Sequence, residues 1–231
     1  MHLVMFDIDG TLTATYEADT VCYVQALREA FGFSDVDTDW SNYPHCSDSG
    51  ILETVFQTRL GRPPQVEENA AMQVRFVSLL SETVADAPFR QIPGAREFLE
   101  TLRADPSTVI SLASGAWECS ARFKLASAGI PSAGIPAAFS DDAPSRVDIM
   151  RKSLERAAQV HGCQTFDTVT YIGDGVWDAR ASRKLGWPFI GIAREPSRML
   201  RLRDEGAVHV FPDFTDAAVL LATLRNSQTG V

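Results

Sequence analysis

Short apolar runs recur along the chain, and the stretches between them carry helical periodicity. Each run is too short and too apolar to face water on one side, so each predicts a buried strand. The runs cover residues 3–6, 108–113, 137–139, 168–172, 188–192 and 207–211. Strands that alternate with helices favour a parallel sheet covered on both faces. The sequence therefore predicts an α/β fold built on a doubly wound parallel sheet.

Residues 14–88 interrupt this alternation, because no convincing strand lies between the first run and the second. Apolar residues there recur at helical spacing, which predicts three amphipathic helices. The buried stripes are expected at Val21, Val24, Leu27 and Phe31; at Ile51, Leu52, Val55, Phe56 and Leu60; and at Met72, Phe76, Leu79 and Leu80. Pro88 and the Pro93–Gly94 pair mark the return to the alternation. We expect a helical unit inserted after the first strand.

The composition excludes several classes of protein. The net charge of -9 argues against a protein that grips nucleic acid through its phosphates. No apolar stretch approaches the ~20 residues that span a bilayer, and no leader-like segment opens the chain, so we expect no membrane partner and a cytoplasmic location. The cysteines are far apart and predict isolated, reduced thiols: Cys22, Cys46, Cys119 and Cys163.

Acidic and small polar residues directly follow three of the predicted strands. They are Asp7, Asp9, Gly10 and Thr11 after the first, Ser114 and Gly115 after the second, and Asp174 and Asp178 after the fourth. The carboxyl ends of parallel strands meet at one edge, so these groups are expected to converge there. A bound cation or a shared proton relieves the repulsion between such carboxylates, and Mg²⁺ prefers oxygen ligands of this kind.

Taken together, DIDGT at residues 7–11, a serine after the second strand and GDGVWD at 173–178 resemble the haloacid dehalogenase superfamily in its phosphatase branch. A helical cap between the first and second strands is a further similarity. The resemblance implies a Rossmann-like core of residues 1–13 and 89–231 and a cap of residues 14–88. It also implies Mg²⁺ as cofactor and a small phosphorylated metabolite as substrate.

The resemblance assigns roles to the matching residues. Asp7 would attack phosphorus to form an aspartyl-phosphate, and Asp9 would act as general acid and base. Gly10 would allow a sharp turn, which the Thr11 hydroxyl would brace beside the phosphate. Ser114 and Gly115 would hold the phosphoryl oxygens. Mg²⁺ would be bound by Asp7, the Asp9 carbonyl, Asp174 and Asp178.

One position departs from the family pattern. The family usually has a lysine near the start of the helix after the third strand, where it offsets the charge of the nucleophile. Alignment by the following acidic and apolar pair puts Arg146 there, and a guanidinium can also bind phosphate. Lys152 is the alternative, although it lies six residues further on and is expected on the surface.

The loop at residues 42–51 is expected to join two cap helices and to set substrate choice. His45, Ser47 and Asp48 are the candidate substrate contacts. Ser47 and Asp48 are equal candidates for the N-cap of the helix that carries Ile51. A cap of this size favours a small substrate, because a closing lid leaves little space for a folded protein.

Three functions are compatible with these residues. A phosphatase is the main hypothesis, and a phosphomutase with the same site and cap is the nearest rival. A non-catalytic phosphate-binding or regulatory module is disfavoured by the complete acid set, and a dehalogenase has no need of the second acid, Asp9. The protein is expected to be a monomer or a homodimer.

Overall fold

The six predicted strands form one parallel sheet in the order β3-β2-β1-β4-β5-β6. The computed structural model describes residues 1–85 and 87–229, so residue 86 of the predicted cap and the last two residues of the predicted core lie outside it. The strands are β1 (His2–Phe6), β2 (Thr108–Ala113), β3 (Ala137–Ala138), β4 (Thr168–Gly173), β5 (Phe189–Ile192) and β6 (His209–Phe211). The predicted α/β class is confirmed. The last strand is shorter than predicted, because Val208 is 81% exposed and lies outside the ladder.

Strand β1 lies in the middle of the sheet, between β2 and β4. Phe6, its last residue, is opposite Leu112 on one side and Ile172 on the other. The chain order therefore reverses direction at β1, and the crevice beyond such a switch point is where open α/β sheets bind ligands. The segments that follow β1, β2 and β4 all begin at the same level of the sheet.

Helices cover both faces of the sheet because β1 and its neighbours are apolar on both. Val4 and Phe6 point to the face covered by α4 (Ala95–Ala104), α5 (Glu118–Ser127) and α9 (Ala217–Thr229). Leu3 and Met5 point to the opposite face, against α6 (Arg146–His161) and α7 (Val176–Leu185). Helix α8 (Pro196–Asp204) packs beside β5 and β6. None of the helices in the described part of the chain is long and apolar enough to cross a membrane.

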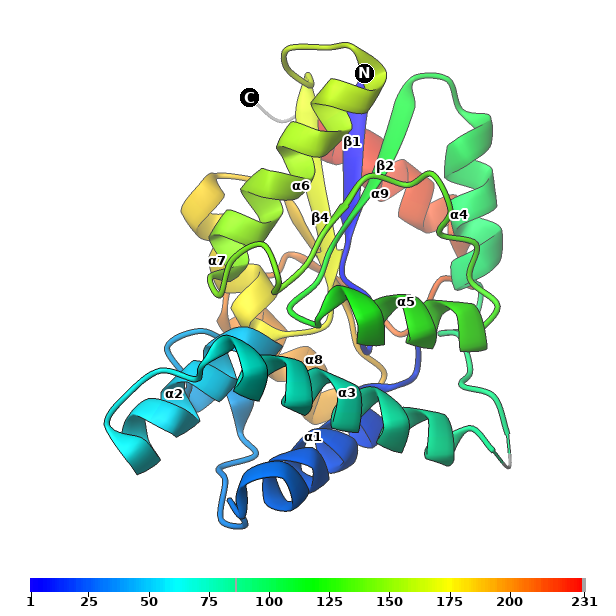
Figure 1. The fold of residues 1–231 in the computed structure, drawn as a ribbon. Helices are drawn as coiled ribbons and strands as arrows, with labels where there is room; N and C mark the ends of the chain where they lie inside the picture. Colours follow the sequence, from blue (N-terminus) through cyan, green and yellow to red (C-terminus); the bar gives the residue numbers. More distant parts are fainter. Residues whose placement is uncertain (86, 230–231) are drawn as a thin grey trace.

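Helices α1 (Tyr16–Phe31), α2 (Asp48–Leu60) and α3 (Val66–Thr83) form a bundle with a hydrophobic cluster of its own, and a short 3₁₀ turn (Trp40–Asn42) joins it. Figure 1 shows the bundle at the end of the molecule opposite the N-terminus, next to the carboxyl ends of the strands. Trp117, from the loop before α5, is buried in the same cluster. The bundle is therefore packed directly against the sheet and the helices that cover it, which are together called the sheet domain below.

Two residues of the expected stripes lie outside the buried faces. Val21 is 63% exposed, because the buried arc of α1 is centred one position further on, at Cys22 and Tyr23. The Tyr23 ring contacts Trp117, which fixes that rotation. Leu60 is 49% exposed in the last turn of α2. The stripe expected on α3 is buried throughout.

Candidate active site

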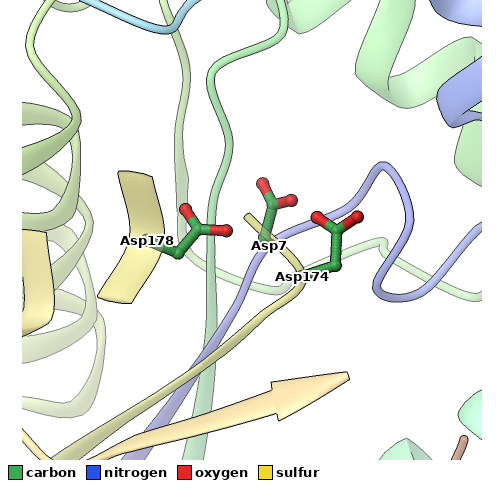
Figure 2. A group of neighbouring side chains, drawn as sticks. All are labelled: Asp7, Asp174 and Asp178. Atoms are coloured by element: carbon green, nitrogen blue, oxygen red, sulfur yellow. The ribbon is translucent and has the colours of Figure 1, made fainter. Parts of the chain in front are cut away.

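Three carboxylates gather beyond the ends of β1 and β4. The Asp7 N–H donates to the Ile172 carbonyl at 2.9 Å, which continues the ladder by one residue and fixes the start of the loop. Asp7, Asp174 and Asp178 each place a carboxylate oxygen within 4.8 Å of the other two (Figure 2). All three residues are buried. The sheet register thus brings together acids that are more than 160 residues apart in the chain.

Burial and mutual repulsion favour the protonated forms of these acids. Burial, followed by the charge of Asp178, raises the pKa of Asp7 well above its usual value. Burial raises the pKa of Asp174 to about 7, against the opposing effect of Arg198. Burial also raises the pKa of Asp178, whose Oδ1 atom accepts no hydrogen bond. An all-oxygen set with this excess of negative charge fits a hard divalent cation.

Arg146 is the cation nearest to Asp7. It is the first residue of α6 and is buried, with Nη1 at 3.2 Å from Asp7 Oδ1 and Nε at 3.2 Å from Asp178 Oδ1. Lys152, the alternative, extends into solvent from the same helix and pairs with Glu155. The structure therefore puts Arg146 and not Lys152 beside the predicted nucleophile.

Asp9 and Asp7 line one pocket, and both carboxylate oxygens of Asp9 accept hydrogen bonds. The Thr15 hydroxyl donates to Oδ1 at 2.5 Å, and the Lys124 ammonium donates to Oδ2 at 2.6 Å. Lys124 also forms an ion pair with Asp19 of α1. Burial lowers the pKa of the Lys124 amine, but the carboxylates of Asp19 and Asp9 outweigh it and raise that pKa above its usual value.

The chain turns sharply after Asp9. Gly10 has a φ of 75°, and a Cβ at this position would overlap the Asp174 carboxylate, so glycine is required by both conformation and space. The expected brace at Thr11 is wrong, because its buried hydroxyl has no hydrogen-bond partner. The Thr13 hydroxyl holds the turn instead, by donating to the Ile8 carbonyl at 3.1 Å.

Ser114 and Gly115 follow β2 and line the same pocket as Asp7. The Ser114 hydroxyl accepts a hydrogen bond from the Ala116 N–H at 3.2 Å. A Cβ on Gly115 would come within 2.9 Å of Arg146 Nη2, so the glycine allows the guanidinium to approach this loop.

The loop before α2 is tied to the sheet domain at Asp48. The Asp48 N–H donates to the Gly115 carbonyl at 2.7 Å, and Asp48 Oδ2 accepts from the Trp117 N–H at 2.9 Å. Ser47 is the N-cap of α2, because its hydroxyl accepts from the Gly50 N–H. Asp48 lines the pocket beside Asp7, whereas His45 is exposed and lines a separate hollow.

A pocket lies between the bundle and the sheet edge. On the side of the sheet it is lined by Asp7, Asp9, Ser114, Gly115, Ala116 and Arg146. The bundle contributes a wall of aromatic, acidic and hydroxyl side chains, which comprises Tyr16, Asp19, Thr20, Tyr23, Trp40, Ser47 and Asp48. Trp177, between the two acids of the fourth strand's motif, lines it as well. Residues of the bundle and of the sheet edge, Asp7 among them, therefore face one common pocket.

Two cations of the site were not identified from the sequence. Lys124 lies on the buried face of α5 with Ala121 and Leu125, so a lysine at an apolar position was the available signal. Arg198 lies four residues before the buried Leu202 in α8 and forms an ion pair with Asp174. In both cases the partner acid comes from a distant segment, which periodicity does not reveal.

The comparisons with known proteins agree with this geometry. A family model for haloacid dehalogenase-like hydrolases matches residues 1–186. A hydrolase from Pseudomonas syringae has a TM-score of 0.72 and 21% identity, over 96% of this chain and 99% of that one. A proposed β-phosphoglucomutase from Bacteroides vulgatus has a TM-score of 0.69 and 17% identity, over 100% and 91% of the two chains.

CbbY from Rhodobacter sphaeroides, solved in complex with phosphate, has a TM-score of 0.65 and 19% identity, over 93% of this chain and 95% of that one. The comparison with curated proteins gave no match. At these identities the solved structures show a shared fold. Because the family model spans most of the chain and its acids are assembled at the sheet edge, the protein belongs to the haloacid dehalogenase-like hydrolases.

Proposed function

We propose that this protein is a Mg²⁺-dependent phosphatase that hydrolyses a small phosphomonoester through an aspartyl-phosphate on Asp7. The observation that carries the proposal is the position of the Asp7 carboxylate: it lines a pocket, forms an ion pair with Arg146 and lies beside the carboxylates of Asp174 and Asp178. We further propose that residues 14–88 act as a cap over a core of residues 1–13 and 89–231.

In the first step, an Asp7 oxygen forms a bond to phosphorus while the bond from phosphorus to the leaving oxygen breaks. Asp9 gives its proton to that oxygen, so the alcohol leaves neutral. In the second step Asp9 takes a proton from water, the water oxygen bonds to phosphorus, and the Asp7–phosphorus bond breaks. Asp7 is thereby restored as a carboxylate.

The remaining residues would stabilise charge on the phosphoryl group. Arg146 would supply N–H donors, and Ser114 would supply a hydroxyl from the same pocket. Asp7, Asp174 and Asp178, with the Asp9 carbonyl, would hold Mg²⁺. When bound, the metal neutralises negative charge on the phosphoryl oxygens and on the acids around them.

The test is phosphate release from a panel of phosphorylated metabolites, with Mg²⁺ present and after chelation. Asp7→Asn keeps the shape of the site but is no nucleophile, so turnover should be abolished while substrate still binds. Asp148→Asn is a matched control, because Asp148 is an exposed acid on α6. Substantial phosphate release by Asp7→Asn would exclude the covalent mechanism.

The same assay distinguishes the proposed phosphatase from a phosphomutase. A mutase would convert a sugar phosphate to its isomer of equal mass and release little free phosphate. Release of one phosphate per substrate consumed supports the phosphatase.

A further inference from the structure

Lys124 is a fully buried lysine whose charge is directed at the active site. Its side chain is 0% exposed, and its ammonium contacts Asp9 of the β1 loop and Asp19 of α1. The ammonium also lies 5.9 Å from the centre of the Phe76 ring in α3. One side chain of the sheet domain thus meets the β1 loop and two helices of the bundle.

Stability alone gives no reason for a lysine here. Removing an ammonium and a carboxylate from water is unfavourable, and well-packed apolar side chains often replace such pairs without loss of stability. The neighbours of Lys124 in α5, Ala121 and Leu125, are apolar and fully buried. A methionine or leucine would continue that face, so the lysine requires another explanation.

The explanation lies in how Asp9 is held. Its two oxygens have one donor each, Thr15 at 2.5 Å and Lys124 at 2.6 Å, and only the first of these donors belongs to the segment that forms the bundle. Thr15 immediately precedes α1, whereas Lys124 belongs to α5 of the sheet domain. Asp19, one turn into α1, forms a second ion pair with the Lys124 ammonium. The carboxylate of Asp9 therefore has both of its donors when α1 is packed against α5.

We propose that Lys124 is a positioning residue for Asp9, and that its ion pair with Asp19 makes that position depend on the seating of the α1–α3 bundle. The inference rests on the proposed function, because it assigns to Asp9 the proton transfer to the leaving group. Lys124 itself touches neither phosphorus nor the leaving oxygen. Its loss should impair the reactions that need a proton donor and spare those that do not.

Two probe substrates of nearly equal shape separate these cases, phenyl phosphate and 4-nitrophenyl phosphate. Phenolate is a poor leaving group that needs a proton, whereas nitrophenolate leaves readily without one. In Lys124→Met, kcat/KM for phenyl phosphate should fall on the order of a hundredfold, as expected when general acid catalysis is lost. The fall for 4-nitrophenyl phosphate should be several times smaller.

Lys124→Met leaves Asp9 and Asp19 without their cation and could fail to fold, so a double variant is included. Lys124→Met with Asp19→Asn removes one positive and one negative charge and leaves the local net charge unchanged. It should show the same preference for the activated ester. Asp19→Asn alone keeps Lys124 on Asp9 but removes its link to α1, so it should shift the ratio of the two rates in the same direction as Lys124→Met and by less. Lys152→Met, at an exposed lysine, is the control.

The outcomes distinguish the two proposals. Equal losses for both esters in the double variant, with a wild type that hydrolyses both, overturn the role of Lys124 and leave the proposed function intact. A wild type that releases phosphate from neither ester, nor from any metabolite in the panel, overturns both. A selective loss for phenyl phosphate supports Lys124 as the positioning residue.

Discussion

Arg146 contacts two acids of the site, and its removal would leave their charges uncompensated. We expect Arg146→Ala to lower kcat on the order of a hundredfold or more, as when a charged donor is lost from a site that excludes water. Arg146→Lys should recover much of the loss, because a lysine also neutralises Asp7. Lys152→Ala is the control, and steady-state kinetics provide the measurement. Wild-type turnover in Arg146→Ala would show that Arg146 has no role in the reaction.

Single residues also mark the limit of what the sequence could predict. The acids of the site follow predicted strands, so their convergence followed from the parallel topology. Lys124 is different, because its partners Asp9 and Asp19 are 115 and 105 residues away and belong to another part of the fold. A lysine on an apolar helix face signals a buried charge, but only the packing of α1 against the sheet domain reveals the acid that it meets.

At the scale of elements, the N-cap of helix α2, Ser47, makes two hydrogen bonds. The Ser47 hydroxyl accepts from the Gly50 N–H and donates to the Pro144 carbonyl at 2.7 Å. Ser47→Ala removes both bonds and should cost about 1 kcal/mol through the lost cap. The melting temperature should then fall by roughly 2–4 °C for a chain of this size.

Ser49 provides the comparison for that prediction. Its hydroxyl donates to the Ser140 carbonyl at 2.9 Å but caps no helix. Ser49→Ala should therefore cost less than Ser47→Ala in the same thermal melts. An equal or larger effect at Ser49 would contradict the assignment of Ser47 as the cap. The sequence left this cap open between Ser47 and Asp48, because both residue types accept from a helix N-terminus and only the observed contacts separate them.

The sequence predicted where the strands and helices lie along the chain, but it did not predict how each helix is rotated about its own axis. The runs that begin at Leu3 and Thr108 are strands because their residues are apolar on both faces. The sequence predicted helix α1 at this place in the chain, but it did not predict which face of the helix is buried. Val21 and Tyr23 are both apolar enough to be buried, and they lie on different faces. The contact of Tyr23 with Trp117, 94 positions along the chain, decided between them.

At the scale of the whole molecule, the buried acids predict how stability depends on pH. Folding raises the pKa of Asp174 to about 7, whereas an unfolded carboxyl ionises near pH 4. Between these values the folded protein binds more protons, so the metal-free protein loses stability as the pH rises through this window. We expect the melting temperature without metal to be lower at about pH 8 than at about pH 5.

Mg²⁺ should reverse that trend, because it binds the ionised carboxylates and competes with protons. The rise in melting temperature on adding Mg²⁺ should be larger at the higher pH. Asp174→Asn should flatten the pH dependence of the metal-free protein and reduce the effect of Mg²⁺. A melting temperature that rises with pH in metal-free wild type would refute this account.

The tie between Asp48 and the loop after β2 has a kinetic consequence. Two hydrogen bonds through Asp48 and two more from Ser47 and Ser49 cross from the bundle to the sheet domain. Separation of the bundle from the sheet domain requires all four hydrogen bonds to break. At about 0.5–1.5 kcal/mol each, they would slow this separation by one to several orders of magnitude.

If the two parts must separate before inorganic phosphate departs, phosphate will leave more slowly than the alcohol forms. Mixing enzyme and substrate rapidly should then give an initial burst of alcohol close to one equivalent per active site, followed by a slower linear phase.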